Sequence, residues 1–295
     1  MTVALAGGTG FTGRRVAARL VRQGLALRCL VRAGSDRSSL PAGAEAVVGD
    51  LGDVASLGRW LAGCESLVYT ASMGFGHVPG VIAAAEAAGV RRAVFVSTTA
   101  IFTRLAASSK GVRVAAEDAV RASRLAWTIV RPTMIYGAPG DRNMERMLRS
   151  LARWPFVLVP GNGKALIQPL HVEDLADGIV AAFASPVAER REYDLSGKSP
   201  LAFDAAIDAA AAALGKRRRK LHLPLGPLAA TLGFLERLRL PLPVKAEQVL
   251  RLAEDKAFSS DVAGRDFGYA PRDFAAGIAE EARLLGLVPG GPRGA

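Results

Sequence analysis

The feature that most restricts the fold of this chain is a cluster of four glycines between Gly7 and Gly13. The cluster follows an apolar run at 3–7 and precedes a helical pattern at 13–24, whose apolar residues recur on one face. A strand, a tight turn and a helix in this order place backbone N–H groups where a phosphate binds. The spacing Gly7-x-x-Gly10-x-x-Gly13 therefore predicts a dinucleotide site; the alternative is an ordinary glycine-rich turn.

The first half of the chain repeats this alternation of short apolar runs and helical patterns. Further strands are expected at 26–32, 44–50, 66–72, 91–99 and 126–132, with helices at 54–62, 80–89 and 111–123. Strands joined through such helices form a parallel sheet with right-handed crossovers. The predicted fold class is α/β: a doubly wound parallel sheet, the Rossmann arrangement, with a smaller mixed C-terminal substrate domain.

The second half of the chain is less regular. It predicts a strand and a glycine turn, then a helix from about 172, a strand at 191–197 and helices at about 203–214, 226–239 and 244–254. We place the domain boundary near residue 135. The predicted parts are a dinucleotide-binding domain of residues 1–135 and about 166–197, a substrate-binding region of residues 136–165 and 198–288, and a disordered tail of residues 289–295.

Composition argues against several functional classes. The net charge of +11 is compatible with nucleic-acid binding. However, the arginines are scattered and no basic stripe with interleaved aromatic residues occurs, so nucleic-acid binding is not expected. The two cysteines form no CxxC pair and the three histidines lie far apart, which argues against a metal site. We find no signal-peptide pattern and no apolar run of roughly 18 residues, so a cytoplasmic protein is expected.

Basic residues around the second strand bear on the choice of dinucleotide. An Asp or Glu at its end would bind the ribose 2′-hydroxyl of NAD, whereas this strand ends in Arg32, with Arg37 beyond it and Arg14 opening the first helix. Guanidinium groups favour a 2′-phosphate, so NADP is predicted rather than NAD. The alternative is that these arginines are solvated surface residues. Asp36 is expected to be a turn residue, and Arg15 to lie on the helix surface.

The third expected strand ends in Asp50, at the sheet edge where ligands of such folds bind. Its carboxylate could accept a hydrogen bond from the adenine amino group. The alternative role is N-cap of the following helix, for which Asp53 competes.

Motifs over most of the chain resemble those of the short-chain dehydrogenase/reductase superfamily. The resemblance is closest to the extended and atypical branches, which include NAD-dependent epimerase/dehydratases and nucleotide-sugar epimerases. It is carried by GGTGFTG, LVRAGS, GDLGD, AGVRRAVFVSTTA, AAEDAVRASRLAWTIVRPTMIYG, QPLHVEDLADGI and RDFGYAPRDFAAGI. It implies a cofactor site built from Gly7, Thr9, Gly10, Phe11, Thr12, Gly13, Asp50, Leu51, Thr70, Ala71, Ser72, Arg131, Pro132 and Thr133. It also implies that the strand-five hydroxyls of Ser97 and Thr98 touch the substrate.

The chain departs from this family at the catalytic acid/base pair. Family enzymes carry Tyr-x-x-x-Lys on the helix after the fifth strand, whereas the matching positions here hold Ser109 and Arg113. No tyrosine lies between Tyr69 and Tyr136. Candidate replacements for the pair are Lys110 and the hydroxyls of Ser97, Thr98, Ser109 and Tyr136.

Two functional hypotheses follow. The first is an NAD(P)-dependent oxidoreductase or epimerase acting on a sugar, nucleotide- or lipid-linked, or on a related keto or hydroxy compound. In that case Arg142 and Asn143 could meet a substrate anion, although a plain polar loop is equally compatible with them. The second is a cofactor-binding regulator or assembly factor without chemistry. His171 is expected to be structural, and Asp174 to serve the first turn of its helix.

A basic run at 216–220 precedes the segment 221–235, which holds no Asp, Glu, Lys or Arg. Basic residues beside an apolar segment can hold a protein peripherally on an anionic membrane. The alternative is a buried strand at 221–225, a substrate-domain helix at 226–239 and a solvated basic loop.

Overall fold

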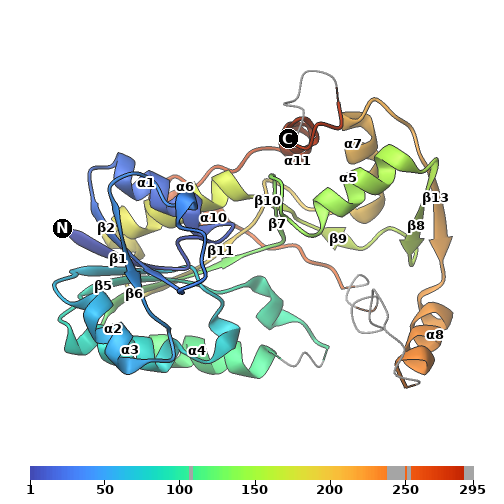
Figure 1. Ribbon diagram of the computed structural model, residues 1–295. Coiled ribbons are helices and arrows are strands. Elements are labelled where there is room, and N and C mark those ends of the chain that lie inside the picture. Colours follow the sequence, from blue (N-terminus) through green and yellow to red (C-terminus); the bar gives the residue numbers. More distant parts are fainter. Residues whose placement is uncertain (106–108, 238–249, 251–253, 289–295) are drawn as a thin grey trace.

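A seven-stranded parallel sheet forms the centre of the larger lobe (Figure 1). The structure is a computed structural model, and it describes residues 1–105, 109–237, 250 and 254–288. Its strand order is β11-β6-β5-β4-β1-β2-β3. The strands are Thr2–Ala6 (β1), Ala26–Val31 (β2), Ala44–Val48 (β3), Ser66–Tyr69 (β4), Arg92–Val96 (β5), Ala126–Pro132 (β6) and Arg191–Leu195 (β11). The doubly wound fold is therefore confirmed, with its topological switch point at β1, which lies between β2 and β4.

Helices cover both faces of this sheet (Figure 1). Gly13–Arg22 (α1), Val172–Ala184 (α6) and Asp261–Phe267 (α10) share one apolar core with it, and Val54–Leu61 (α2), Val78–Ala87 (α3) and Lys110–Ala122 (α4) share another. Because both faces are covered, the inner strands are largely apolar, as in the fully buried Val3, Ala4 and Leu5. Within the segment 166–197, residues 172–195 return to the large sheet, since α6 packs on α1 and β11 pairs with β6, whereas the short strands at 166–171 pair in the smaller lobe.

The rest of the chain forms a smaller lobe around a third apolar core. Its helices are Met144–Arg153 (α5), Phe203–Ala213 (α7), Leu225–Arg237 (α8) and Phe274–Leu284 (α11). Its strands pair two by two: Ile135–Tyr136 (β7) with Leu170–His171 (β10), Leu166–Ile167 (β9) with Leu201–Ala202 (β12), and Phe156–Pro160 (β8) with Arg219–Leu223 (β13). Short 3₁₀ turns occupy Arg37–Ser39 (η1), Met73–Phe75 (η2), Thr99–Phe102 (η3) and Pro186–Ala188 (η4).

The second half of the chain differs from expectation in two places. Helix α5 was not anticipated, although Met144, Leu148 and Leu151 recur at helical spacing and are buried. The strand expected at 221–225 lies two residues earlier and is largely exposed rather than buried, because only its β8 partner covers it. The helix expected at 244–254 and the tail 289–295 lie mostly or wholly outside the described residues.

A buried pair of carboxyl groups ties α11 to the loop after β7. Asp141 Oδ1 accepts hydrogen bonds from the first backbone N–H groups of α5, including that of Met144 at 2.8 Å. Glu281 Oε2 accepts from Gly137 N at 3.1 Å, while its buried Oε1 has no donor among the described residues. Burial and the neighbouring Asp141 carboxyl raise the pKa of Glu281 to about 9. We infer that Glu281 keeps its proton at neutral pH and shares it with Asp141.

Replacing Glu281 by Gln should stabilise the protein at alkaline pH. Between the ordinary glutamate pKa of 4.5 and about 9 the folded state keeps a proton that the unfolded chain releases, so the free energy of unfolding falls as pH rises. Glutamine keeps both hydrogen bonds without ionising, and we expect a gain of about 1–3 kcal/mol at alkaline pH.

Denaturant unfolding of wild type and Glu281→Gln at acidic, neutral and alkaline pH measures this difference. The matched control is Glu280→Gln, on the neighbouring 41%-exposed side chain, where a change of no more than about 1 kcal/mol is expected. An equal pH dependence in wild type and Glu281→Gln would contradict the shared proton.

Candidate functional site

The glycine turn between β1 and α1 is folded tightly against the end of β4. Gly7 has φ +81°, and a Cβ on it would lie 2.8 Å from Thr70 Oγ1. A Cβ on Gly13 would collide with the carbonyl oxygen of Gly7. Thr70 Oγ1 in turn donates to Ala6 O at 2.7 Å, which locks β4 to the start of the turn. Only glycine fits these two positions, so the turn has the shape that a pyrophosphate requires.

The N-terminus of α1 is open to an anion. Thr12 stands at the N-cap position but makes no side-chain capping bond. The first N–H groups of a helix have no partner within the helix and carry the positive end of its dipole. The residues present therefore fit the phosphates of a dinucleotide, as expected for Gly7, Thr9, Gly10, Phe11, Thr12 and Gly13.

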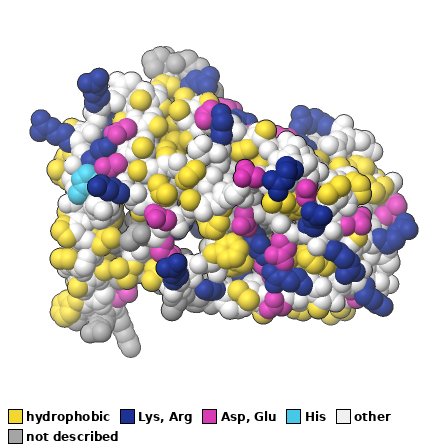
Figure 2. Space-filling model, turned by 180° about the vertical axis from the view of Figure 1, so that it is seen from behind, with side chains coloured by type: hydrophobic (Ala, Val, Ile, Leu, Met, Phe, Trp, Pro, Cys, Tyr) yellow, Lys and Arg dark blue, Asp and Glu magenta, His cyan; other side chains and the backbone are white. Residues whose placement is uncertain are grey.

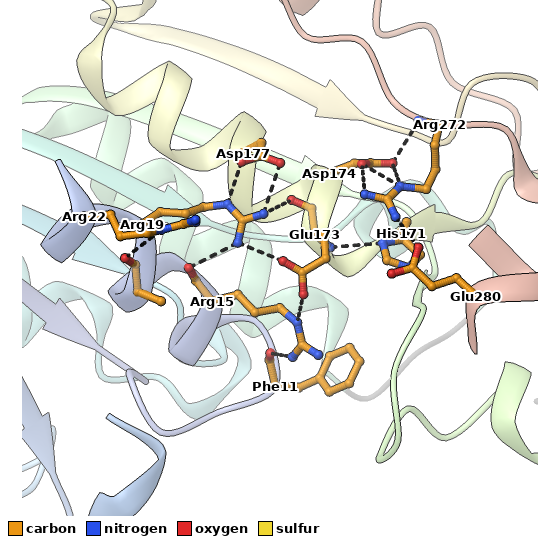
Figure 3. Close-up of polar contacts among 11 residues, drawn as sticks. Phe11, Arg15, Arg19, Arg22, His171, Glu173, Asp174, Asp177, Arg272 and Glu280 are labelled. Carbon is orange, nitrogen blue, oxygen red and sulfur yellow. Dashed lines mark hydrogen bonds and ion pairs between the residues drawn. The ribbon is translucent and has the colours of Figure 1, made fainter. Parts of the chain in front are cut away.

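Arg15 anchors the glycine turn to α6, which corrects the expectation that it lies on the helix surface (Figure 3). Its Nε lies 2.6 Å from Glu173 Oε1, and its Nη1 donates to Phe11 O at 2.6 Å. Arg19, one turn later, pairs with Glu173 and Asp177. Burial raises the pKa of Glu173, but the two guanidinium groups outweigh this effect and hold the pKa below its usual value. The sequence gives no local signal for this contact, because its partners are about 158 residues apart.

Arg14, Arg32 and Arg37 differ from Arg15 because none of them pairs with a carboxylate in the described part of the chain. Arg32 and Asp50 line a cavity of about 370 Å³ at the carboxyl ends of β2 and β3. This is the side of the sheet on which the glycine turn lies. Of these three guanidinium groups, that of Arg32 lies in the cavity where the adenosine is expected to bind.

Two aspartates that follow β3 have different roles. Asp53 caps α2 through Ala55 N and Ser56 N, so Asp50 does not have the capping role that was its alternative. Asp50 Oδ1 accepts from Gly52 N at 2.7 Å and remains exposed, next to the half-buried Leu51. Asp36 caps the 3₁₀ turn η1, which confirms its assignment to a turn.

Ser72 follows β4, and Ser97 and Thr98 follow β5; all three carry side-chain hydroxyl groups. Ser72 caps η2 and Thr98 caps η3 through their side chains, and Ala71 lies against Gly7. Ser97 differs, because its buried Oγ has no hydrogen-bond partner among the described residues. A buried hydroxyl without a partner is costly unless a ligand satisfies it.

The positions that match the missing Tyr and Lys are joined by a hydrogen bond. Arg113 Nη1 donates to Ser109 Oγ at 2.9 Å, one helical turn apart at the start of α4. Arg113 also lies against η2, since a Cβ on Gly74 would be 3.3 Å from its Nε. Lys110 Nζ instead donates to the carbonyl of Thr103 at 2.6 Å. The structure thus brings a hydroxyl and a cation together at this site, but they belong to Ser109 and Arg113.

Arg131 belongs to a buried ion-pair network. It donates to both carboxylate oxygens of Glu117 on α4, at 2.9 and 2.6 Å, and also pairs with Glu192 on β11. Despite its burial, these bonds raise the pKa of Arg131. Its guanidinium lies 5.3 Å from the ring centre of Phe102 in η3. Its contacts in this structure are therefore structural, and its expected contact with the cofactor stays a prediction.

The two residues that follow Arg131 are also engaged in the scaffold. Thr133 Oγ1 donates to Gln168 O at 2.6 Å, and the carbonyl of Pro132 accepts from Thr99 Oγ1 at 3.2 Å. These bonds join the end of β6 to the small lobe and to η3.

Tyr136 lies in the core of the small lobe, away from solvent. It is 1% exposed and its hydroxyl donates to Phe274 O at 3.5 Å, while burial raises its pKa. His171 packs edge-on against it and caps α6 through Glu173 N, which confirms the structural role expected of His171. Asp174 lies in the first turn of α6 as expected, but its carboxylate is paired with Arg272 (Figure 3).

The two residues expected to meet a substrate anion are exposed at the start of α5. Arg142 and Asn143 follow Asp141, whose carboxylate caps the helix. Among the described residues, no hydrogen bond or ion pair joins them to the residues at the ends of β4 and β5.

Sequence reasoning missed a second, larger cavity of about 640 Å³ in the small lobe. Its walls include the apolar Pro160, Phe203 and Leu225 beside the polar Lys164 and His222. The expected glycine turn at 161–164 forms part of its rim, with Gly161 and Gly163 both at positive φ. The signal in the sequence was the apolar segment after residue 220, which was interpreted as a membrane or core element rather than as a cavity wall.

A family model described as NAD(P)H-binding matches residues 7–151 of this chain. Among curated proteins, the chain is 33% identical over 234 residues to the ceramide reductase of Caulobacter vibrioides, covering 75% of this chain and 73% of that protein. It is 26% identical to the 4-hydroxy-2-methyl-3-oxo-4-farnesyl-3,4-dihydroquinoline-1-oxide ketoreductase of Stigmatella aurantiaca, covering 100% of this chain and 98% of that protein.

Solved structures support the fold. The UDP-glucose 4-epimerase of Thermotoga maritima superposes with a TM-score of 0.75, covering 97% of this chain and 98% of that one at 13% sequence identity. At this identity the likeness concerns the fold alone.

Substituting Gly13 by Ala should disrupt the dinucleotide site. The added Cβ meets the backbone of Gly7, which cannot move without displacing the turn, and we expect NADPH binding to weaken at least about tenfold with a loss of roughly 1–3 kcal/mol in stability. Gly58→Ala in α2 is the matched control, because its Cβ meets nothing within 4 Å. Fluorescence titration with NADPH and thermal unfolding measure both effects. Equal NADPH affinity in wild type and Gly13→Ala would contradict the assignment.

Proposed function

Because this chain belongs to the NAD(P)H-binding short-chain dehydrogenase/reductase family, we propose that it is an NADPH-dependent reductase of a ketone carried on a long apolar chain. The observation that carries the proposal is the hydrogen bond between Ser109 and Arg113. It leaves a polarised hydroxyl and a cation at the positions where the family has its acid/base pair, so the altered sequence retains both chemical components.

The role of the Ser109 hydroxyl follows from its chemistry. A serine hydroxyl is a poor base at neutral pH, so we infer that it acts as a hydrogen-bond donor rather than as a proton acceptor. In reduction the protein needs donors that stabilise negative charge as it develops on the carbonyl oxygen. The Ser109 hydroxyl, with Arg113 donating to its oxygen, is free to donate its own hydrogen, and the unpartnered Ser97 hydroxyl is a second donor. Bound NADPH supplies the hydride.

The preference for NADPH rests on unpaired charge. Arg14, Arg32 and Arg37 lack carboxylate partners among the described residues, while the neighbouring Arg15 is fully engaged with Glu173. A 2′-phosphate would supply the missing counter-ion, and a ribose hydroxyl would not. The carboxylate that binds the 2′-hydroxyl of NAD has no counterpart at Arg32.

Reversing the charge at Arg32 should therefore change cofactor preference. We expect Arg32→Glu to weaken NADPH binding by about tenfold or more and to leave NADH binding nearly unchanged, because a charge-assisted hydrogen bond contributes roughly 1.5–3 kcal/mol. Arg22→Glu, exposed at the far end of α1, is the control. Calorimetric titration with both nucleotides gives the ratio of dissociation constants. An unchanged ratio in Arg32→Glu would argue for NAD or for another anion site.

The substrate class rests on the second cavity and on the relatives. The 640 Å³ cavity has an apolar part, formed by proline, phenylalanine and leucine side chains, beside the polar Asn162, Lys164, His222 and Asp255, and we infer that an alkyl or prenyl chain would contact the apolar part. The two curated relatives are named as reductases of ceramide and of a farnesylated ring. We therefore favour a β-keto lipid over the sugar substrate suggested by the sequence.

Turnover tests this proposal directly. We expect purified protein to oxidise NADPH with a long-chain β-keto amide, with kcat/KM at least about tenfold above that for its short-chain homologue or for a keto UDP-sugar. Ser97→Ala should lower kcat by about a hundredfold, and Arg113→Lys should retain more activity than Arg113→Ala. Arg124→Ala, with an 84%-exposed side chain, is the control. Turnover only with the keto sugar would overturn the substrate class.

The missing tyrosine favours a second candidate, a cofactor-binding protein without chemistry. In that case NADPH should raise the unfolding temperature while no keto substrate is reduced. The biological activity of the protein would then survive Ser97→Ala and Arg113→Ala but fail in Gly13→Ala. The opposite pattern supports the reductase.

A further inference from the structure

The outer face of the two-stranded ribbon β8–β13 is apolar and uncovered. Phe156 and Leu158 on β8 are 42% and 54% exposed, and Leu221 on β13 is 47% exposed. Trp154, just before β8, is 50% exposed. Figure 2 shows hydrophobic side chains along the left edge of the molecule, the end that carries this ribbon. Several exposed apolar side chains gathered on one ribbon can mark an interaction site.

The register of the ribbon separates this face from a polar one. Leu221 is the direct neighbour of Leu158, and side chains alternate between faces along each strand. The neighbours on the opposite face are turned toward α7, where Lys220 pairs with Asp208 and His222 with Asp204. The apolar face therefore follows from the strand pattern: Lys220 and His222 pair within the lobe, whereas Arg219 lies on the same face as Leu221, next to Phe156.

The surroundings of the apolar face are positively charged. Residues 146–172 and 209–235, which contain the two strands, hold no Asp or Glu. Four exposed cations border the face without a carboxylate partner among the described residues, namely Arg153, Lys216, Arg217 and Arg219. The guanidinium of Arg153 lies 5.2 Å from the ring centre of Trp154. Exposed aromatic and aliphatic groups beside unpaired cations complement the headgroups and upper acyl chains of an anionic membrane.

We propose that the β8–β13 face docks on an anionic lipid bilayer, with Trp154, Phe156, Leu158 and Leu221 inserted at the interface. Trp is typical of membrane–water interfaces, and cations near it neutralise lipid phosphates. No helix in the described part of the chain has the length and apolar character needed to cross a bilayer, so the contact is peripheral. A second copy of the chain is the less favoured occupant, because the same cations would face one another across a symmetric contact.

The docking face leads to the larger cavity. Both strands run parallel, and the residues at their carboxyl ends, Pro160 and His222, line the cavity together with Leu225. This part of the inference rests on the proposed reductase function: a lipid substrate would enter the cavity from the bilayer on which the ribbon rests.

Vesicle sedimentation with the full chain tests the docking. We expect binding to phosphatidylcholine vesicles containing phosphatidylglycerol at low salt, and at least about tenfold weaker binding to phosphatidylcholine alone or at high salt. The double variants Phe156→Ser/Leu158→Ser and Arg217→Glu/Arg219→Glu should each lower the partition coefficient by at least about tenfold. Matched controls at exposed sites elsewhere are Val54→Ser and Arg22→Glu/Arg124→Glu.

Unchanged NADPH binding shows that each variant is folded. Lack of vesicle binding by wild type, or equal loss in the control variants, overturns the proposal. A wild-type dimer in light scattering that Phe156→Ser/Leu158→Ser dissociates, without vesicle binding, assigns the face to a second copy instead. Vesicle binding and the turnover of a short-chain ketone are separate readouts, so failure of the membrane proposal and failure of the reductase proposal can be distinguished.

Discussion

The close approach of the β1–α1 turn to the end of β4 is the constraint on which the site depends. Gly7 and Gly13 have no room for a Cβ, and the hydroxyl of Thr70 fills the remaining space while bonding to β1. This packing occurs at the switch point of the sheet, where the helices leave in opposite directions and a crevice opens. The phosphate site is thus formed by backbone atoms whose position is set by the central strands.

The role of an arginine in this chain depends on whether its guanidinium group is paired with a carboxylate. Arg15 and Arg131 are held by carboxylates from distant segments and act as internal ties, one from α1 to α6 and one from β6 to α4 and β11. Removing one partner of a buried ion pair typically costs about 3–5 kcal/mol of stability, so the fold depends on both members of such a pair being present. Arg32, which was predicted to bind the cofactor, has no carboxylate partner among the described residues and remains available to an external anion. Residue type alone does not separate the two groups.

The small lobe combines a well-packed apolar interior with an exposed apolar face. Its core contains Tyr136 and His171 in edge-to-face contact, and the Glu281–Asp141 carboxyl pair closes it toward α11. Its far end, in contrast, exposes the apolar face of β8–β13 and lines a cavity. The interior accounts for stability, and the exterior supports the proposed substrate and membrane contacts.

The sequence by itself determined the Rossmann fold, the positions of most of its elements and the glycine turn, because these follow from local periodicity and from the backbone freedom of glycine. It also located the altered acid/base pair, since that is a matter of spacing within one helix. Only the tertiary structure decided that Arg15 is a tie rather than a surface residue, and that Arg131 is buried against Glu117. It alone showed that Tyr136 is in the core and that two short strands form an exposed ribbon. The physical reason is that these outcomes depend on contacts between segments 14 to more than 150 residues apart, which no local pattern encodes.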